Sequence, residues 1–253
     1  MKGIKVSYII ITWNGIDYLR QLLESMRRQL SRPDVEVIIT DNHSTDGTVA
    51  FLEESYPTVR LLCLPENKGV AFARNTALRE ARGKYLLILD NDIRITDEAV
   101  AAMEDFMDAH EDVGICGCKL LYPDGAEQVS CKPYPGFWKK VRSICSSSAQ
   151  NEYATEMRGK EPFEPTYIIG ACQMIRREVY QKIGELDEKI FYGPEDCDYC
   201  MRARSAGWRV LYIPTVHMYH HCQRRTHANP FSRLGWRHVK ALMYFYRKYK
   251  RIS

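Results

Sequence analysis

One short apolar run constrains the fold of this chain most strongly. Residues 85–89 (YLLIL) follow Gly83 closely and lead directly into Asp90, Asn91 and Asp92. An uninterrupted apolar run of this length is typical of a strand that is buried on both faces of a parallel sheet. The carboxyl end of a central strand in an α/β sheet opens into the ligand crevice. The run therefore predicts that both aspartates lie in a binding crevice.

Two carboxylates at this spacing repel each other unless a cation or a donor-rich ligand lies between them. The simplest occupant is a divalent metal that has oxygen ligands and also binds a diphosphate. An Asp-x-Asp triplet is equally common in solvated turns, so the rest of the chain decides the interpretation.

Strands and helices alternate through the first half of the chain. Strands are predicted at 6–12, 35–40 and 59–64, and the spacing of apolar residues predicts helices from 19 to 30 and from 70 to 81. This alternation predicts an α/β fold with a mostly parallel, Rossmann-like sheet flanked by helices. Neither G-x-G-x-x-G nor a P-loop occurs, which argues against dinucleotide and ATP-type phosphate cradles.

The second half is less regular. Residues 122–165 contain five prolines and a run of serines, and they read as a long irregular insertion. Pro194 is well placed to begin a helix whose first turn carries Glu195 and Asp196, where acids suit the helix dipole. The remaining predictions are a helix at 96–109, strands at 113–118, 209–213 and 216–221, an apolar segment at 166–176 and a final helix at 232–250.

Composition describes an ordinary globular protein, with 45% apolar and 27% charged residues among 253. Nine cysteines form an odd set without framework spacing, so we expect reduced thiols and a cytoplasmic location. Cys197 and Cys200 have no second pair at zinc-ribbon spacing and are interpreted as buried structural cysteines. The first residues read as a strand rather than a secretory signal, and no apolar stretch approaches the ~20 residues of a spanning helix.

Charge is distributed unevenly along the chain. All 32 acidic residues lie at or before Asp198, whereas twelve of the 36 Lys and Arg residues follow it. A basic C-terminal segment suggests an anionic partner. The final helix combines an aromatic, apolar face with a basic one, so two interpretations stay open: it lies on an anionic membrane leaflet, or it packs on the α/β domain.

Several motifs occur in a characteristic order. Taken together they resemble the family 2 glycosyltransferases with a GT-A fold, particularly the rhamnosyltransferase-like branch, over roughly residues 4–221. The motifs are IITWN at 10–14, DNHSTDGT at 41–48, NKGVAFARN at 67–75, LDND at 89–92, GAC at 170–172, GPEDCDYCMR at 193–202, Tyr212-x-Pro214 and His220.

The resemblance implies a catalytic domain over 1–222, with 122–165 as the acceptor-site region and 223–253 as a basic helical extension. It implies inverting, metal-dependent transfer of a sugar from a UDP- or dTDP-sugar to a hydroxyl of a glycan or lipid-linked acceptor, in surface polysaccharide synthesis. Donor and acceptor are the expected partners, without nucleic acid. Contact with the inner leaflet of the cytoplasmic membrane and the oligomeric state stay open.

The resemblance also implies a Mg²⁺ or Mn²⁺ ion that acts as a Lewis acid on the leaving diphosphate. Asp92 is expected to be the main carboxylate ligand, and Asp90 to face the ribose or the outer shell of the metal. His220 resembles the metal-contacting histidine of the family. Its alternative is a surface histidine in a His-rich stretch.

On the donor side, Asp41 resembles the aspartate that accepts the N3–H of uracil or thymine, with helix capping as its alternative role. Thr12 and Asn14 are expected beside the base and ribose. Arg74 either reaches the diphosphate or is a solvated helix arginine. The other residues expected to contact the donor are Gly69, Asn91, Gly170 and Ala171, the last two as a close backbone wall beside the sugar.

An acceptor hydroxyl needs its proton removed as it attacks. Asp196 resembles the catalytic base of the family, which implies in-line displacement with inversion, and Glu195 is expected to position the acceptor. The alternative makes both acids only helix N-terminal charges.

Two other functions remain open on the sequence alone. A nucleotidyltransferase would carry a glycine-rich, basic loop after the first strand, where this chain has Thr12-Trp13-Asn14-Gly15. A nucleic-acid or anionic-surface binding module would use the basic C-terminus, but no recognisable binding fold precedes it.

Overall fold

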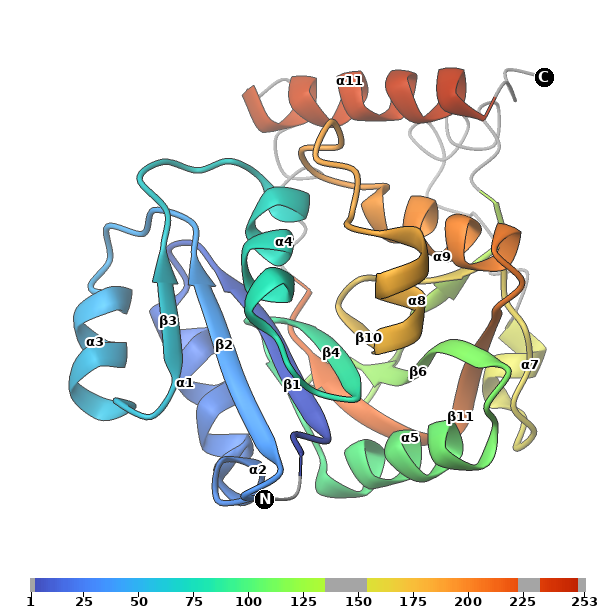
Figure 1. Cartoon of the computed structure of the whole chain (residues 1–253), viewed down its shortest axis with the longest axis horizontal. Helices are drawn as coiled ribbons and strands as arrows, with labels where there is room; N and C mark the ends of the chain where they lie inside the picture. The colour runs from blue at the N-terminus through green and yellow to red at the C-terminus, as the bar shows by residue number, and fades with distance from the viewer. Residues whose placement is uncertain (1–2, 135–153, 223–232, 250–253) are drawn as a thin grey trace.

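A computed structural model describes residues 3–134, 154–222 and 233–249 of the chain. Its centre is a nine-stranded mixed sheet in the order β3-β2-β1-β4-β10-β6-β11-β5, with β7 paired to β6 (Figure 1). The strands are β1 (Val6–Thr12), β2 (Val35–Asp41), β3 (Arg60–Cys63), β4 (Tyr85–Asp90), β5 (Ile93–Arg94), β6 (Val113–Leu121), β7 (Glu127–Gln128), β10 (Cys172–Arg176) and β11 (Arg209–His220). A separate antiparallel pair joins β8 (Cys131–Lys132) to β9 (Tyr167–Ile168).

Helices cover both faces of the sheet. They are α1 (Ile16–Ser25), α2 (Arg27–Leu30), α3 (Thr48–Ser55), α4 (Val70–Glu80), α5 (Asp97–Ala109), α7 (Ala154–Arg158), α8 (Arg177–Ile183), α9 (Glu195–Ser205) and α11 (Arg233–Lys248). Among the described residues, none of these helices is both long and apolar enough to cross a bilayer.

Alternation along the strands divides the core in two. Tyr8 and Ile10 of β1 point to one face and pack with apolar residues of α1 and α5, whereas Ile9 points to the other face. There it packs with residues of α4, α8, α9 and α11. Because both faces are covered, strands such as β4 are fully buried and read as continuous apolar runs.

The predicted parallel sheet of the first half is confirmed. β1 lies between β2 and β4 and is parallel to both, with Thr12 opposite Asp41 and Ile11 opposite Asp90. This register brings the polar residues that end three strands to one edge of the sheet.

The apolar segment at 166–176 is not one strand. It divides into β9 and β10, and Gly170 and Ala171 lie between them. β10 runs antiparallel between β4 and β6, with Cys172 opposite Leu89, so the two residues arrive beside the end of β4. The Asp90 N–H donates to the Ala171 carbonyl at 3.2 Å.

The two strands predicted at 209–213 and 216–221 form one long strand, β11. Its register against β6 shifts between Ile213 and His217, around Pro214, which cannot donate a ladder hydrogen bond. Beyond this irregularity His220 pairs with Ile93 of β5. Because Ile93 directly follows Asp92, this pairing brings His220 close to Asp92.

The predicted insertion at 122–165 carries short elements. β7, β8 and α7 lie within it, and residues 135–153 fall outside the described part of the chain. Most of the predicted extension at 223–253 is α11; residues 223–232 and 250–253 are not described.

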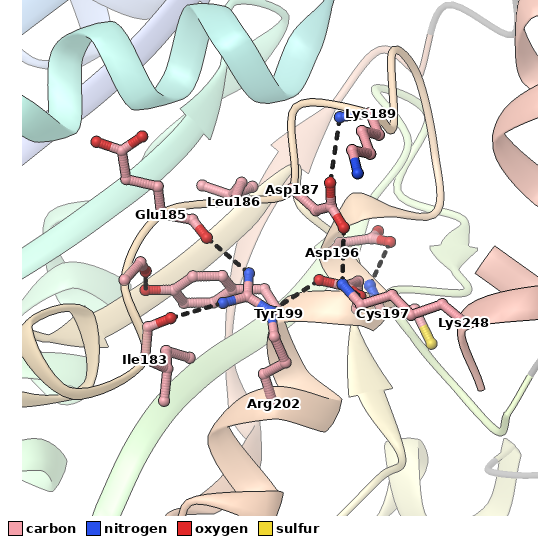
Figure 2. A network of polar contacts seen from close by, with 12 residues as sticks. Ile183, Glu185, Leu186, Asp187, Lys189, Asp196, Cys197, Tyr199, Arg202 and Lys248 are labelled. Atoms are coloured by element: carbon pink, nitrogen blue, oxygen red, sulfur yellow. Dashed lines mark hydrogen bonds and ion pairs between the residues drawn. The ribbon is translucent and has the colours of Figure 1, made fainter. Parts of the chain in front are cut away.

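A buried carboxylate, that of Asp198, joins α11 to α9; Figure 2 shows its neighbours Arg202 of α9 and Lys248 of α11. Asp198 is fully buried, and it accepts hydrogen bonds from Arg202 Nε at 2.8 Å and from the Tyr249 hydroxyl at 2.9 Å. Lys248 Nζ lies 2.6 Å from Asp198 and 2.7 Å from Asp187. Arg202 also donates to backbone carbonyls of the 183–185 turn. The network fixes the C-terminal end of α11 on the α/β domain.

Replacing Asp198 with alanine is expected to lower the free energy of unfolding by about 3–5 kcal/mol, because it leaves the cationic partners without their buried carboxylate. Urea denaturation followed by circular dichroism measures the change. Asp112→Ala is the matched control, since Asp112 is exposed and pairs with exposed Arg209. Equal midpoints for Asp198→Ala and the wild type would contradict this role.

Candidate active site

Asp90, Asp92 and His220 converge at the end of β4, as the sequence predicts. Each offers one ligand atom, and the three atoms lie within 4.8 Å of one another. Asp92 Oδ1 is 3.2 Å from His220 Nε2, and the two residues are only 5% and 6% exposed. This burial excludes the alternative of a surface histidine.

The cluster fits a divalent metal. Two carboxylate oxygens and one imidazole nitrogen form a donor set that suits Mg²⁺ or Mn²⁺. His220 Nδ1 lies 2.6 Å from Gln128 Oε1, and an amide oxygen only accepts, so Nδ1 carries the proton. This bond fixes the orientation of the ring and leaves Nε2 facing Asp92. A metal-binding histidine is usually held in this way, through a hydrogen bond at its other ring nitrogen. The residues present therefore fit the ion that the resemblance implies.

The carboxylates of the cluster shift the pKa values of their neighbours. Burial lowers the pKa of His220, but the hydrogen bond with Asp92 and the charges of Asp92 and Asp90 raise it on balance. Burial raises the pKa of Asp90, and the neighbouring Asp92 raises it further, whereas Arg74 lowers it. With His220 neutral, the carboxylates of Asp90 and Asp92 exceed the single positive charge of Arg74, and this excess favours a cation.

Arg74 lies under this cluster. Its side chain is 2% exposed, so the alternative of a solvated helix arginine is wrong. Nη2 lies 2.7 Å from Asp90 Oδ1, and Nη1 lies 3.0 Å from Glu195 Oε1. Nη2 also donates to the Gly170 carbonyl at 2.8 Å. A single guanidinium therefore joins α4, the end of β4, the turn before β10 and the start of α9.

Gly170 is required by that guanidinium. A Cβ at this position would lie 2.5 Å from Arg74 Nη1. The Gly170 N–H donates to Asp196 Oδ2 at 3.0 Å, while its carbonyl accepts from Arg74. The close approach at Gly170 is therefore to Arg74, and the contact of Gly170 and Ala171 with a donor sugar stays a prediction.

Asp196 and Glu195 begin α9 and differ in environment. Asp196 is half-buried, and its two oxygens accept from the N–H groups of Gly170 and Cys197. Glu195 is buried and its Oε2 has no partner in the described residues. Burial and the charge of Asp196 raise the pKa of Glu195 to about 7, although Arg74 lowers it.

A cleft opens beside the metal cluster at the carboxyl ends of β1 and β4. Asn42 Nδ2 donates to Asn67 Oδ1 at 3.1 Å and shapes its wall. Gly69 has φ +91°, and a Cβ there would lie 2.5 Å from the Phe191 carbonyl, so only glycine fits this turn. The lining residues are Ile11, Thr12, Trp13, Asn42, Asn67, Gly69, Val70, Asp90, Asn91, Asp92, Phe191 and Tyr192.

The residues predicted around the base fall into two groups. Thr12 accepts from Asn91 Nδ2 at 3.0 Å, and both line the cleft. Asp41 is buried next to Thr12 in the sheet; its Oδ2 accepts from the Ser44 N–H, and its Oδ1 has no partner in the described residues. Such an unpartnered buried oxygen needs a hydrogen-bond donor, and a ligand could supply it.

Asn14 contacts the neighbouring loop that contains Thr45. Its backbone has φ +48°, and its Oδ1 accepts from the Thr45 N–H at 2.7 Å. Asp46 accepts from the N–H groups of Ile16 and Thr48, at the starts of α1 and α3. Asn14 and Asp46 therefore join the two loops beside the cleft, and Asp46, rather than Asp41, takes the capping role.

Three residues near the site were not singled out from the sequence. Gln128 stands on a two-residue strand within the insertion, where no periodicity is readable. Phe191 and Tyr192 close the cleft through a loop whose fold depends on the contact with Gly69. Only the adjacency of Phe191-Tyr192 to the Gly193-Pro194-Glu195-Asp196 motif could have indicated them.

The raised pKa of Glu195 makes the free energy of unfolding depend on pH. Between its usual pKa of 4.5 and about 7, the unfolded chain releases this proton while the folded chain keeps it. Stability therefore falls as pH rises through this window, by about 3 kcal/mol at most, and levels off above it. Glu195→Gln, which keeps an acceptor for Arg74, is expected to remove this part of the fall.

Urea denaturation of both proteins in EDTA, at several pH values across this window, measures the difference. Stability differences between wild type and variant that stay constant with pH would contradict the raised pKa of Glu195.

Comparisons with known proteins agree with this geometry. The sequence model of glycosyl transferase family 2 matches residues 7–184. The N-acetylglucosaminyl-diphospho-decaprenol L-rhamnosyltransferase of Mycobacterium tuberculosis is 27% identical, over 93% of this chain and 82% of its own length. The dTDP-rhamnosyl transferase RfbF of Shigella flexneri is also 27% identical, over 84% of this chain and 67% of its own.

Solved structures support the fold. The mannosyltransferase PcManGT of Pyrobaculum calidifontis, in complex with GDP-Man and Mn²⁺, has a TM-score of 0.65 at 22% identity and covers 98% of this chain. Residues 1–349 of S. aureus TarS with UDP-GlcNAc give a TM-score of 0.56 at 21% identity over 85%. This chain spans 64% and 58% of those two structures.

The family match covers well over half of the chain, and the expected GT-A-like sheet with its acidic cluster is present. These findings decide against the nucleotidyltransferase and the non-enzymatic binding module. The chain belongs to glycosyl transferase family 2 and is a glycosyltransferase.

Proposed function

We propose that the protein is an inverting, divalent-metal-dependent glycosyltransferase that moves a deoxyhexose, rhamnose, from a dTDP-sugar to a hydroxyl of a lipid-linked glycan acceptor. The reaction would serve surface polysaccharide synthesis. One observation carries the proposal: the Gly170 backbone and Arg74 join the metal-binding carboxylate Asp90 to the half-buried carboxylate of Asp196. Asp90, proposed to act on the donor side, and Asp196, proposed to accept the proton, are thus connected through Gly170.

The choice of donor rests on the relatives. Two proteins that cover most of this chain are named as rhamnosyltransferases, and one of them names dTDP-rhamnose chemistry and the other a diphospho-decaprenol acceptor. The unpartnered Oδ1 of Asp41 suits the N3–H of thymine. Uracil presents the same N3–H, so a UDP-sugar remains the alternative that the assay has to decide.

A bound Mg²⁺ or Mn²⁺ would neutralise charge on the leaving diphosphate. Asp92, His220 and Asp90 are the residues that would hold it. Gln128 keeps the His220 ring in the tautomer whose Nε2 can bind a metal. Arg74 holds Asp90 in place at 2.7 Å, and its charge opposes the rise that burial causes in the pKa of Asp90.

Asp196 is the proposed base. Its carboxylate accepts the proton of the acceptor hydroxyl as that oxygen bonds to the anomeric carbon. The bond from this carbon to the diphosphate oxygen breaks at the same time, and the nucleoside diphosphate leaves with the electron pair. Attack opposite the leaving group inverts the anomeric centre. The N–H groups of Gly170 and Cys197 hold the carboxylate for this role.

Glu195 is proposed to position rather than to accept the proton. It is buried against Arg74, and its pKa of about 7 leaves it partly protonated near neutral pH. A carboxyl in this state can both accept from Arg74 and donate through Oε2.

Transfer assays with dTDP-rhamnose, UDP-N-acetylglucosamine and GDP-mannose, on a short-chain lipid diphosphate N-acetylglucosamine acceptor, test the proposal. We expect turnover with dTDP-rhamnose and Mn²⁺ that is lost with EDTA. Asp196→Asn is expected to lower kcat by about 10²–10⁴ with little change in donor affinity, because only the proton acceptor is removed. NMR of the product should show the inverted anomer.

Asp112→Asn, remote and exposed, is the control for a general effect of the substitution. A preference for another donor would overturn the choice of rhamnose. Turnover that survives Asp196→Asn would overturn the assignment of the base, and a retained anomer would overturn the single displacement.

A further inference from the structure

We propose that the outer face of α11, formed by Trp236, Val239, Lys240, Met243 and Arg247, docks on an anionic lipid bilayer. The proposal deepens the proposed function, because a lipid-linked acceptor would reach the cleft from such a surface. It rests on the exposure, the charge and the position of this one helix.

α11 separates its residues cleanly between two sides. Ala241, Phe245 and Tyr246 are at most 2% exposed and pack in the core cluster shared with α4 and α9. Lys248 and Tyr249 bond to the buried Asp198. The packing predicted as one alternative for this helix is therefore present on its inner side, and it does not account for the opposite side.

The outer face concentrates exposed apolar surface. Trp236, Met243 and Val239 are 60%, 48% and 43% exposed. Among the described residues only Trp13 and Val129 are other large apolar side chains of comparable exposure, and Trp13 lines the cleft. Positions 236, 239 and 243 fall along one side of a helix, so the three side chains form a stripe. Such a stripe marks an interaction surface.

The same face is basic. Lys240 and Arg247 lie beside the apolar stripe, and within the described residues neither has an acidic partner. No acidic residue follows Asp198 in the sequence, while Arg224, Arg225, Lys250 and Arg251 flank the helix. A tryptophan with an apolar stripe and cations that have no acidic partner in the described residues matches the interface of an anionic membrane, which attracts each such cation. A protein that bound this basic face would need an acidic surface of its own. A second copy of the helix has no acidic residue and does not offer one.

The position of α11 places the cleft near the docked surface. The helix lies along the top edge of the molecule, above α4 and α9 (Figure 1). His238 Nδ1 is 2.9 Å from the Tyr192 carbonyl, and the Arg237 guanidinium lies 4.1 Å from the centre of the Phe191 ring. Phe191 and Tyr192 line the cleft. The loop that closes the cleft is therefore held by the helix that would rest on the bilayer.

The test is flotation with vesicles of phosphatidylcholine alone and of phosphatidylcholine with phosphatidylglycerol, using the full chain. We expect binding to the anionic vesicles only, weakened by added NaCl. Lys240→Glu/Arg247→Glu should weaken it about tenfold or more, and Trp236→Ser/Met243→Ser should weaken it on the same vesicles. Neither pair bonds the inner side, so both variants should fold as the wild type does.

The matched control is Arg27→Glu/Arg28→Glu on α2, which changes net charge equally at two side chains that are each 78% exposed. Binding that falls equally in this control would overturn the proposal, since net charge alone would explain it. Absence of binding to anionic vesicles would also overturn it, as would a dimer in sedimentation that the Trp236→Ser/Met243→Ser variant abolishes. Vesicle binding is measured without turnover, so a failed transfer assay and a failed docking test are separate results.

Discussion

The site depends on one buried ion network. Arg74 is enclosed by Asp90, Glu195 and the Gly170 carbonyl, and each contact comes from a different element of the fold. Burying a charge is costly unless partners surround it, so removing Arg74 would leave the buried carboxylates of Asp90 and Glu195 without their shared cation. The network therefore fixes the end of β4 against the start of α9. Asp90 and Glu195 are held at a constant separation because one guanidinium binds both.

The same constraint explains several residues that otherwise look unrelated. Gly170 lacks a side chain because Arg74 occupies that space, and its N–H and carbonyl serve Asp196 and Arg74 respectively. The antiparallel insertion of β10 beside β4 delivers this glycine to its place. At the other end, the irregularity of β11 near Pro214 brings His220 to Asp92. Backbone topology thus gathers charges that are far apart in the sequence.

Local patterns in the sequence predicted the α/β class, the first parallel strands and the place of Asp90 and Asp92 at a strand end, whereas His220 was indicated only by the resemblance to family 2 glycosyltransferases. They did so because buried strands read as apolar runs and strand ends share one edge. They did not predict the division of 166–176 by Gly170 or the continuous β11, since both depend on pairing with distant strands. Gln128 was not predicted, because a two-residue strand is too short to show a periodic pattern. The burial of Arg74 could not be predicted, because it follows from tertiary contacts with Asp90, Glu195 and the Gly170 carbonyl.

The central claim is that Asp92 and His220, with Asp90, bind a divalent metal that a nucleoside diphosphate shares. Calorimetric titration of Mn²⁺ into the protein with saturating dTDP, for wild type, Asp92→Asn and His220→Asn, tests it most directly. Asp97→Asn, an aspartate that pairs with Gln29 and Arg28 away from the cleft, is the control. The account predicts Mn²⁺ binding that dTDP strengthens and that both site variants weaken at least about tenfold, while the control binds as the wild type does. Equal Mn²⁺ affinity in all four proteins would contradict it.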